Sequence, residues 1–174
     1  MKLDSHFVGT PLKPYQKTIH WRDTMNYAAA VDDPNDAYFD DMARGITALP
    51  IFPVAATWPM IERISEFIES FARRVGLPGI ILQGTATLAF AVRELINHEA
   101  EARPQRVKAI YGRFTGMVRP GTAIRVMLNH KSSESDGIQL YFSVSNASGE
   151  KAIKDGCLSL AHSQQISEAC ADAL

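Results

Sequence analysis

The chain has 174 residues, 46% hydrophobic and 21% charged, which is typical of one globular domain large enough to bury a core. Its net charge of -1 argues against a general affinity for nucleic acid or anionic membranes. No apolar run reaches the roughly 18 residues needed to cross a bilayer, and residues 1–6 lack the pattern of a signal peptide. The two cysteines, Cys157 and Cys170, are not at metal-ligand spacing, so we expect a reduced, cytoplasmic protein.

The N-terminal third predicts short, interrupted elements. Prolines at positions 11 and 14 argue against a long helix, and a short strand over residues 15–20 is compatible with the pattern. Residues 23–31 predict a short helix that the Asp32-Asp33-Pro34 step ends, and residues 39–44 predict one further turn. The apolar segment 48–54 contains two prolines and therefore predicts an edge or covering segment.

Two longer helices follow. Thr57 predicts a helix cap, with Pro59 near the first turn, and the helix runs to about Val75 before Gly76 and Pro78 end it. The second helix is predicted over residues 85–98. Its apolar stripe is Leu88, Val92, Leu95 and Ile96, flanked by the small residues Ala86, Ala89 and Ala91.

From Arg106 onward the apolar period changes from about 3.6 to 2, which predicts β-strands. Gly112 and Gly156 are interpreted as bulge positions. Helices followed by an antiparallel meander indicate an α+β domain, in which the sheet packs on the helix at 85–98. The four predicted strands are 106–118, 123–130, 138–145 and 151–161.

Three segments, in this order, resemble motifs of the MaoC-like (R)-specific enoyl-CoA hydratases. Residues 32–41 resemble Gly-Asp-x-Asn-Pro-(Leu/Ile)-His-x-Asp, residues 80–90 resemble the Ile-Leu-His-Gly opening of the central helix, and residues 112–122 resemble the Arg-Phe-x-x-Pro-Val-x-Pro-Gly-Asp strand and turn. The resemblance implies a hot-dog fold, a curved antiparallel sheet wrapped around a central helix. It also implies one domain over residues 1–174, with a helical insertion at about 46–79, a polar tail at 163–174, and pairing into a homodimer or a hetero-dimer of hot-dog units.

The same resemblance implies the site residues. Asp33 falls on the family's catalytic Asp, and Tyr38 stands where the family has its catalytic His. Asn35, Gln83 and Gly84 fall on substrate-binding positions, with Gln83 in place of a His. Hydration of an enoyl thioester needs a base for water, an acid for C2 and donors for the enolate-like oxygen, and Gly84 at a helix start offers a free backbone N–H.

Each residue also has a structural interpretation. Asp33 could end the helix, Tyr38 could be either a hydrogen-bond donor or a half-buried aromatic, and Asn35 could hold water or only satisfy the turn. Gln83 could cap its helix, and His20 could approach Asp33 in space.

The function expected from the resemblance is an acyl-thioester hydratase or dehydratase. Its substrate would be an acyl-CoA or an acyl carrier protein thioester, and it would need no cofactor and no metal. The alternative is a non-catalytic hot-dog subunit that shapes the acyl site of a catalytic partner, because residues 49–54 resemble a segment of the non-catalytic halves of such enzymes. A thioesterase on the same fold is a third, less supported, alternative.

Overall fold

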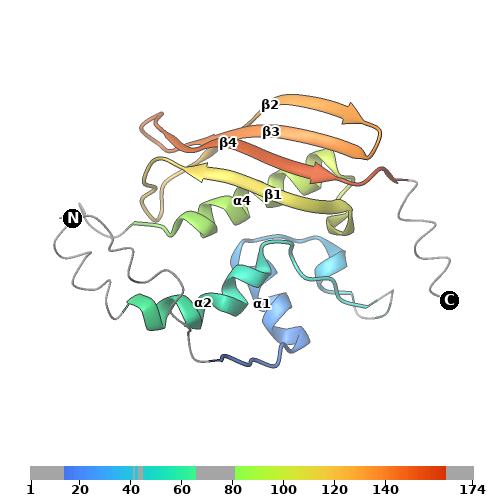
Figure 1. The fold of residues 1–174 in the computed structure, drawn as a ribbon, viewed down its shortest axis with the longest axis vertical. Coiled ribbons are helices and arrows are strands. Elements are labelled where there is room, and N and C mark those ends of the chain that lie inside the picture. Colours follow the sequence, from blue (N-terminus) through green and yellow to red (C-terminus); the bar gives the residue numbers. More distant parts are fainter. Residues whose placement is uncertain (1–13, 41, 43–44, 66–80, 164–174) are drawn as a thin grey trace.

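The computed structural model describes residues 14–40, 42, 45–65 and 81–163. A four-stranded antiparallel sheet covers helix α4 (Gly84–Glu99), and helices α1 (Trp21–Ala30) and α2 (Phe52–Ser65) lie on the side of α4 away from the sheet (Figure 1). The predicted α+β architecture, a sheet on a central helix, is therefore confirmed. Among the described residues, no helix is both long and apolar enough to span a membrane.

The strands are β1 (Val107–Phe114), β2 (Arg125–Glu134), β3 (Gly137–Ser145) and β4 (Lys151–Leu160). Their order in the sheet is β1-β4-β3-β2, with every pair antiparallel. The last three strands form the predicted meander, but β1 pairs with β4 instead of with β2. The first and last strands of the described residues therefore lie side by side, and β1 and β2 are the edge strands.

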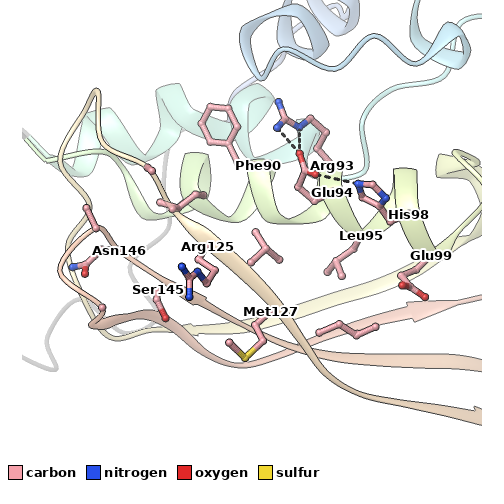
Figure 2. Close-up of a pocket in the computed structure, with 16 residues that line it drawn as sticks. Phe90, Arg93, Glu94, Leu95, His98, Glu99, Arg125, Met127, Ser145 and Asn146 are labelled. Atoms are coloured by element: carbon pink, nitrogen blue, oxygen red, sulfur yellow. Dashed lines mark hydrogen bonds and ion pairs between the residues drawn. The ribbon is translucent and has the colours of Figure 1, made fainter.

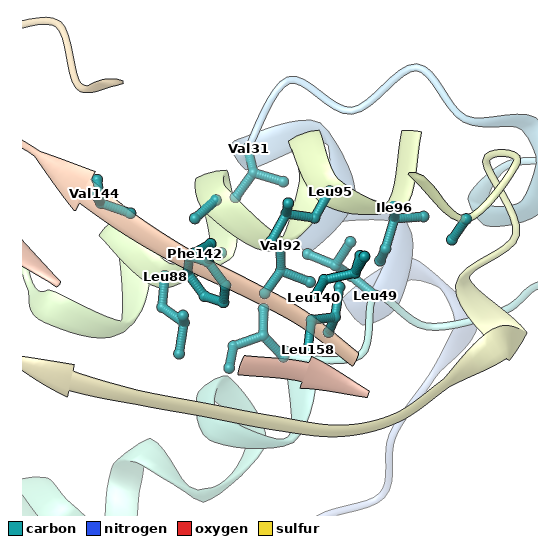
Figure 3. Close-up of a cluster of buried hydrophobic side chains, with 14 of the residues drawn as sticks. Val31, Leu49, Leu88, Val92, Leu95, Ile96, Leu140, Phe142, Val144 and Leu158 are labelled. Carbon is teal, nitrogen blue, oxygen red and sulfur yellow. The ribbon is translucent and has the colours of Figure 1, made fainter. Parts of the chain in front are cut away.

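Helix α4 supplies one wall of the core and the inward face of the sheet supplies the other (Figure 3). The helix matches its predicted range within one residue at each end, because its apolar stripe recurs at helical spacing. Ala89 and Ala91 are fully buried, which allows the backbone of α4 to approach its neighbours closely. The residues that fill this core from the helix and the sheet include Leu88, Val92, Leu95, Ile96, Leu140, Phe142, Val144 and Leu158.

The predicted N-terminal elements are displaced. Residues 14–20 form neither helix nor strand, so the strand proposed for 15–20 is wrong. Helix α1 begins two residues earlier than predicted, because the backbone N–H of His20 donates to the carboxylate of Asp23 (3.0 Å) and closes the helix start. A 3-10 turn, η2 (Asp36–Tyr38), precedes the turn expected at 39–44, which lies partly outside the described residues.

Helix α2 begins inside the segment that its prolines predicted to be non-helical. Pro53 occupies the second position of α2, where a missing N–H removes no helical hydrogen bond. Thr57 does not cap the helix, because it lies within α2 and its hydroxyl donates to the carbonyl of Pro53 (3.0 Å). The predicted continuation to Val75, and the end at Gly76 and Pro78, lie outside the described residues.

A bulge interrupts β4. Both neighbouring strands advance two residues where β4 advances three, so the extra residue lies in β4 next to Gly156, as predicted, and not in β1 at Gly112. Asp155, in this bulge, has a positive φ of 53°. Its carboxylate accepts a hydrogen bond from Arg113 (2.6 Å), which fixes the bulge against β1.

A buried arginine ties the end of β4 to the connection between α4 and β1. Arg106 ends the 3-10 turn η3 (Pro104–Arg106), and its Nε donates to the carbonyl of Ala161 (3.1 Å). Its Nη1 donates to the carboxylate of Glu101 (3.1 Å), and the N–H of Ala161 donates back to the carbonyl of Arg106 (2.7 Å). Two nitrogens of the buried guanidinium are thus hydrogen-bonded.

Candidate functional site

The turn that follows α1 carries the candidate acid and packs against α4. Asp32 takes up a φ of 54°, and the N–H of Asp33 donates to the carbonyl of Ala28 (3.1 Å), so the chain reverses sharply at the helix end. The guanidinium of Arg93, on α4, donates to the carbonyls of Val31 and Asp32. This contact holds the turn on the central helix.

Asp33 is the most buried acidic side chain among the described residues, with 2% exposure. Its Oδ1 accepts hydrogen bonds from the backbone N–H of Asn35 (3.2 Å) and from Nδ2 of Asn97 (3.2 Å). Its Oδ2 is also buried, and no partner for it exists among the described residues. One carboxylate oxygen is therefore held by two donors while the other remains unpaired.

Tyr38 lies in η2 and is fully buried in the core. No described residue forms a hydrogen bond with its hydroxyl. Burial raises the pKa of this phenol far above its ordinary value of about 10, and the negative charge of Asp33 raises the pKa further. Tyr38 is consequently a neutral phenol beside Asp33, able to donate a hydrogen bond.

Asn35 satisfies the local backbone. Its Oδ1 accepts from the N–H of Ala37 (3.0 Å), and its Nδ2 donates to the carbonyl of Ala102 (2.7 Å) and to Oδ1 of Asn97 (3.4 Å). The side chain thereby caps η2 and connects the turn to the end of α4. Both of its polar groups are engaged in this arrangement, which is the structural role that the sequence left open beside substrate binding.

Gln83 and Gly84 lie at the other end of α4. Gly84 begins the helix and Asn97, beside Asp33, lies 13 residues later, so about 20 Å separates the two positions along the axis. Gln83 precedes the helix, but its side chain makes no capping hydrogen bond. Gly84 packs so tightly on Phe114 that an added Cβ would lie 2.9 Å from the ring. The single chain thus brings Asp33, Asn35 and Tyr38 together and separates them from Gln83 and Gly84.

His20 does not approach Asp33. His20 precedes α1 and Asp33 follows it, so the 10-residue helix separates them and the proposed approach is wrong.

Asn97 contacts the Asp33 carboxylate, but the sequence analysis missed it because the two residues are 64 positions apart. A polar Asn inside a helix, next to the apolar Leu95 and Ile96, was the available signal, because Asn is a weak helix former.

A cleft of about 1000 Å³ opens between α4 and the edge strand β2 (Figure 2). Leu95 lines it from the helix, and Arg125 and Met127 line it from the strand. The rim on α4 is charged: Arg93 pairs with Glu94, and His98 lies 3.5 Å from the same carboxylate. Asp33 does not line this cleft, although Arg93 contacts both the cleft and the turn before Asp33.

Comparisons with known proteins give one family match and one curated relative. Residues 68–151 match the family described as the MaoC like domain. A segment of 54 residues is 41% identical to the peroxisomal enoyl-CoA hydratase 2 of Arabidopsis thaliana, covering 31% of this chain and 18% of that protein.

Two solved structures also match. One is a MaoC-like dehydratase from Phytophthora capsici, with a TM-score of 0.45, 23% identity, and coverage of 55% of this chain and 31% of that one. The other is the full-length peroxisomal multifunctional enzyme type 2 of Drosophila melanogaster, with a TM-score of 0.45, 21% identity, and coverage of 87% and 24%. The chain spans less than a third of the length of each of these proteins.

Residues 68–151, which include α4 and strands β1 to β3, are similar to the MaoC-like domain family over just under half of the chain. The motifs at residues 80–90 and 112–122 lie within this match, so the predicted resemblance is confirmed there, together with a sheet packed on a central helix. The match begins after residues 33–38. The roles of Asp33 and Tyr38 therefore stay predictions that rest on geometry and chemistry.

Proposed function

We propose that this protein is an acyl-thioester hydratase or dehydratase, which adds water reversibly to a trans-2-enoyl thioester to give an (R)-3-hydroxyacyl thioester. The observation that carries the proposal is the polar pair of Asp33 and Tyr38 within the apolar core. Asp33 Oδ2 and the Tyr38 hydroxyl are both buried without a partner among the described residues. An unsatisfied buried polar group costs about 1–3 kcal/mol, so its presence calls for a functional explanation.

The chemistry follows from the two groups. Asp33 Oδ2 accepts a proton from water as the water oxygen bonds to C3, and the resulting carboxyl group supplies a proton to C2. Water is thereby added across the double bond, and the carboxylate is regenerated. Tyr38 stays protonated because burial and the charge of Asp33 raise its pKa, so its hydroxyl serves to hold the water and not to act as the base.

The oxyanion donor has to come from elsewhere. The thioester oxygen and C3 of an enoyl thioester are three covalent bonds apart, whereas Gly84 and the residues around Asp33 are about 20 Å apart along α4. We therefore infer that a second hot-dog unit, from a homodimer or a hetero-dimer, completes the site. The edge strand β2 and the adjoining cleft are the surface that we assign to this pairing.

One observation favours the alternative, a non-catalytic hot-dog subunit. Asp33 is 2% exposed and Tyr38 is fully buried, so substrate reaches them only if the covering residues move. In this alternative the pair stabilises the turn, and the chain shapes the acyl site of a catalytic partner. Location in the cytoplasm remains a prediction.

The deciding test is hydration of a short and a medium trans-2-enoyl-CoA by the purified chain, followed through loss of the enoyl absorbance. The molar mass in solution is measured on the same sample by sedimentation. Turnover by a dimeric species supports the proposal. Absence of turnover with both substrates by a chain that is already dimeric would contradict it and favour the non-catalytic alternative.

Replacing Tyr38 with Phe is expected to raise the free energy of unfolding by about 1 kcal/mol and to lower the hydration rate about tenfold. The variant removes an unsatisfied buried hydroxyl but keeps the ring that fills the core. Thermal unfolding and enoyl-CoA turnover measure the two effects. A loss of stability together with unchanged turnover would assign Tyr38 a purely structural role.

The same variant tests the raised pKa of Tyr38. Below about pH 10 the phenol is protonated in both the folded and the unfolded chain. Above that pH the unfolded chain releases a proton that the folded chain retains, so the free energy of unfolding falls as pH rises. We expect this alkaline loss to be smaller in Tyr38→Phe than in the wild-type chain.

A further inference from the structure

We propose that Asn97 is a positioning residue for the Asp33 carboxylate, a role that rests on the proposed hydratase function. Asn97 lies on α4, and its Nδ2 donates to Asp33 Oδ1 across 3.2 Å. Among the described residues, the Asp33 carboxylate accepts one hydrogen bond from a side chain, that of Asn97, and one from the backbone N–H of Asn35. The central helix thereby sets the direction of an acid carried on a different element.

The orientation of the Asn97 amide follows from its neighbours. Asn35 Nδ2 donates to Asn97 Oδ1 (3.4 Å), and the same Nδ2 is anchored to the carbonyl of Ala102 (2.7 Å). Since Asn35 Oδ1 is already occupied by the N–H of Ala37, the amide of Asn35 has one favourable orientation. Asn97 must then present its oxygen to Asn35 and its nitrogen to Asp33.

This arrangement determines which oxygen of Asp33 is free. The two donors occupy Oδ1, whereas Oδ2 has no partner among the described residues. The network therefore leaves Oδ2 as the oxygen available to water.

Among the described residues, the ionisable side chains near Asp33 are those of Tyr38, Arg93 and Asp32. Tyr38 faces it from η2 as a neutral phenol. On α4, Arg93 donates to the carbonyls of Val31 and Asp32 and pairs with Glu94. The side chain of Asp32, next in sequence, is exposed. A negative charge introduced at position 97 would lie next to the Asp33 carboxylate.

The test is Asn97→Asp, which keeps the shape of the side chain but replaces the donor with a carboxylate. Two carboxylates at this distance share a proton, so the apparent pKa on the acid limb of kcat/KM is expected to rise by at least one pH unit. Asn97→Ala removes the donor and is expected to lower kcat about tenfold with little change in KM. Asn26→Asp and Asn26→Ala are the matched controls, because Asn26 is exposed on α1 and does not line the cleft.

A second readout needs no substrate. The side-chain carboxyl of Asp33 is titrated by ¹³C NMR in a chain labelled at Asp, and its signal is identified by its absence in Asp33→Asn. A changed titration of this carboxyl in Asn97→Ala, with no change in Asn26→Ala, supports the inference. An unchanged Asp33 titration and an unchanged pH profile in folded Asn97→Asp would overturn it. A shifted titration in a chain that hydrates nothing would overturn the proposed function while supporting the coupling of Asn97 to Asp33.

Discussion

Replacing Asp33 with Asn is expected to lower the rate of enoyl-CoA hydration at least 100-fold while the chain stays folded. Loss of a general base typically costs about 100- to 10,000-fold in rate, and an amide cannot accept the proton from water. The amide has the same shape as the carboxylate, and its oxygen can still accept from Asn35 and Asn97. The measurement is kcat/KM for a trans-2-enoyl-CoA, with thermal unfolding of the same preparation.

The matched control for this variant is Asp32→Asn. Asp32 is adjacent in sequence but its side chain is exposed, so the same chemical change is made outside the core. We expect the control to retain turnover within about twofold. If Asp33→Asn and Asp32→Asn turn over substrate equally well, the carboxylate of Asp33 is not the base.

Replacing Gly137 with Ala is expected to lower the free energy of unfolding by about 3 kcal/mol, the largest stability change that we predict. Gly137 begins β3 with a φ of 157°, and a Cβ built there would lie 2.2 Å from the carbonyl oxygen of Leu160. The clash is with backbone, so a rotamer change cannot relieve it and β3 and β4 must separate at this end. Chemical denaturation of both proteins measures the difference.

Gly149→Ala separates the clash from the backbone conformation. Gly149 has a φ of 82°, but no atom lies within 4 Å of a Cβ added there. This control carries only the conformational penalty, about 1 kcal/mol. Equal losses of stability in the two variants would show that the contact with Leu160 contributes nothing.

The sequence predicted the parts of the fold that depend on local periodicity. Helix α4 was placed within one residue because Leu88, Val92, Leu95 and Ile96 recur at helical spacing. In β3 the alternation correctly predicted that Leu140, Phe142 and Val144 face the core. These patterns are strong because each element buries one face along its whole length.

The remaining features depend on contacts between distant residues. Helix α1 begins earlier than predicted because Asp23 and His20 form a capping contact. Helix α2 begins at Phe52, in the segment whose prolines argued against a helix. The family resemblance predicted that Gly84 and Asp33 belong to one site. Sequence motifs do not give the distance between residues in space, and within one chain the length of α4 separates these two. Asn97 was missed for the same reason, since its contact with Asp33 spans 64 positions.

The pairing of β1 with β4 has a consequence for synthesis of the chain. The last strand begins 44 residues after the start of β1, at Lys151 against Val107. Because the N-terminus leaves the ribosome first, α4 and β1 emerge before β2, β3 and β4. Strand β1 therefore has no partner until the hairpin of β2 and β3 and then β4 have been made. Sheet closure is therefore a late, non-local event, of the kind that slows folding. A nascent chain that stops before Lys151 lacks β4, the strand that pairs with β1 in the finished sheet.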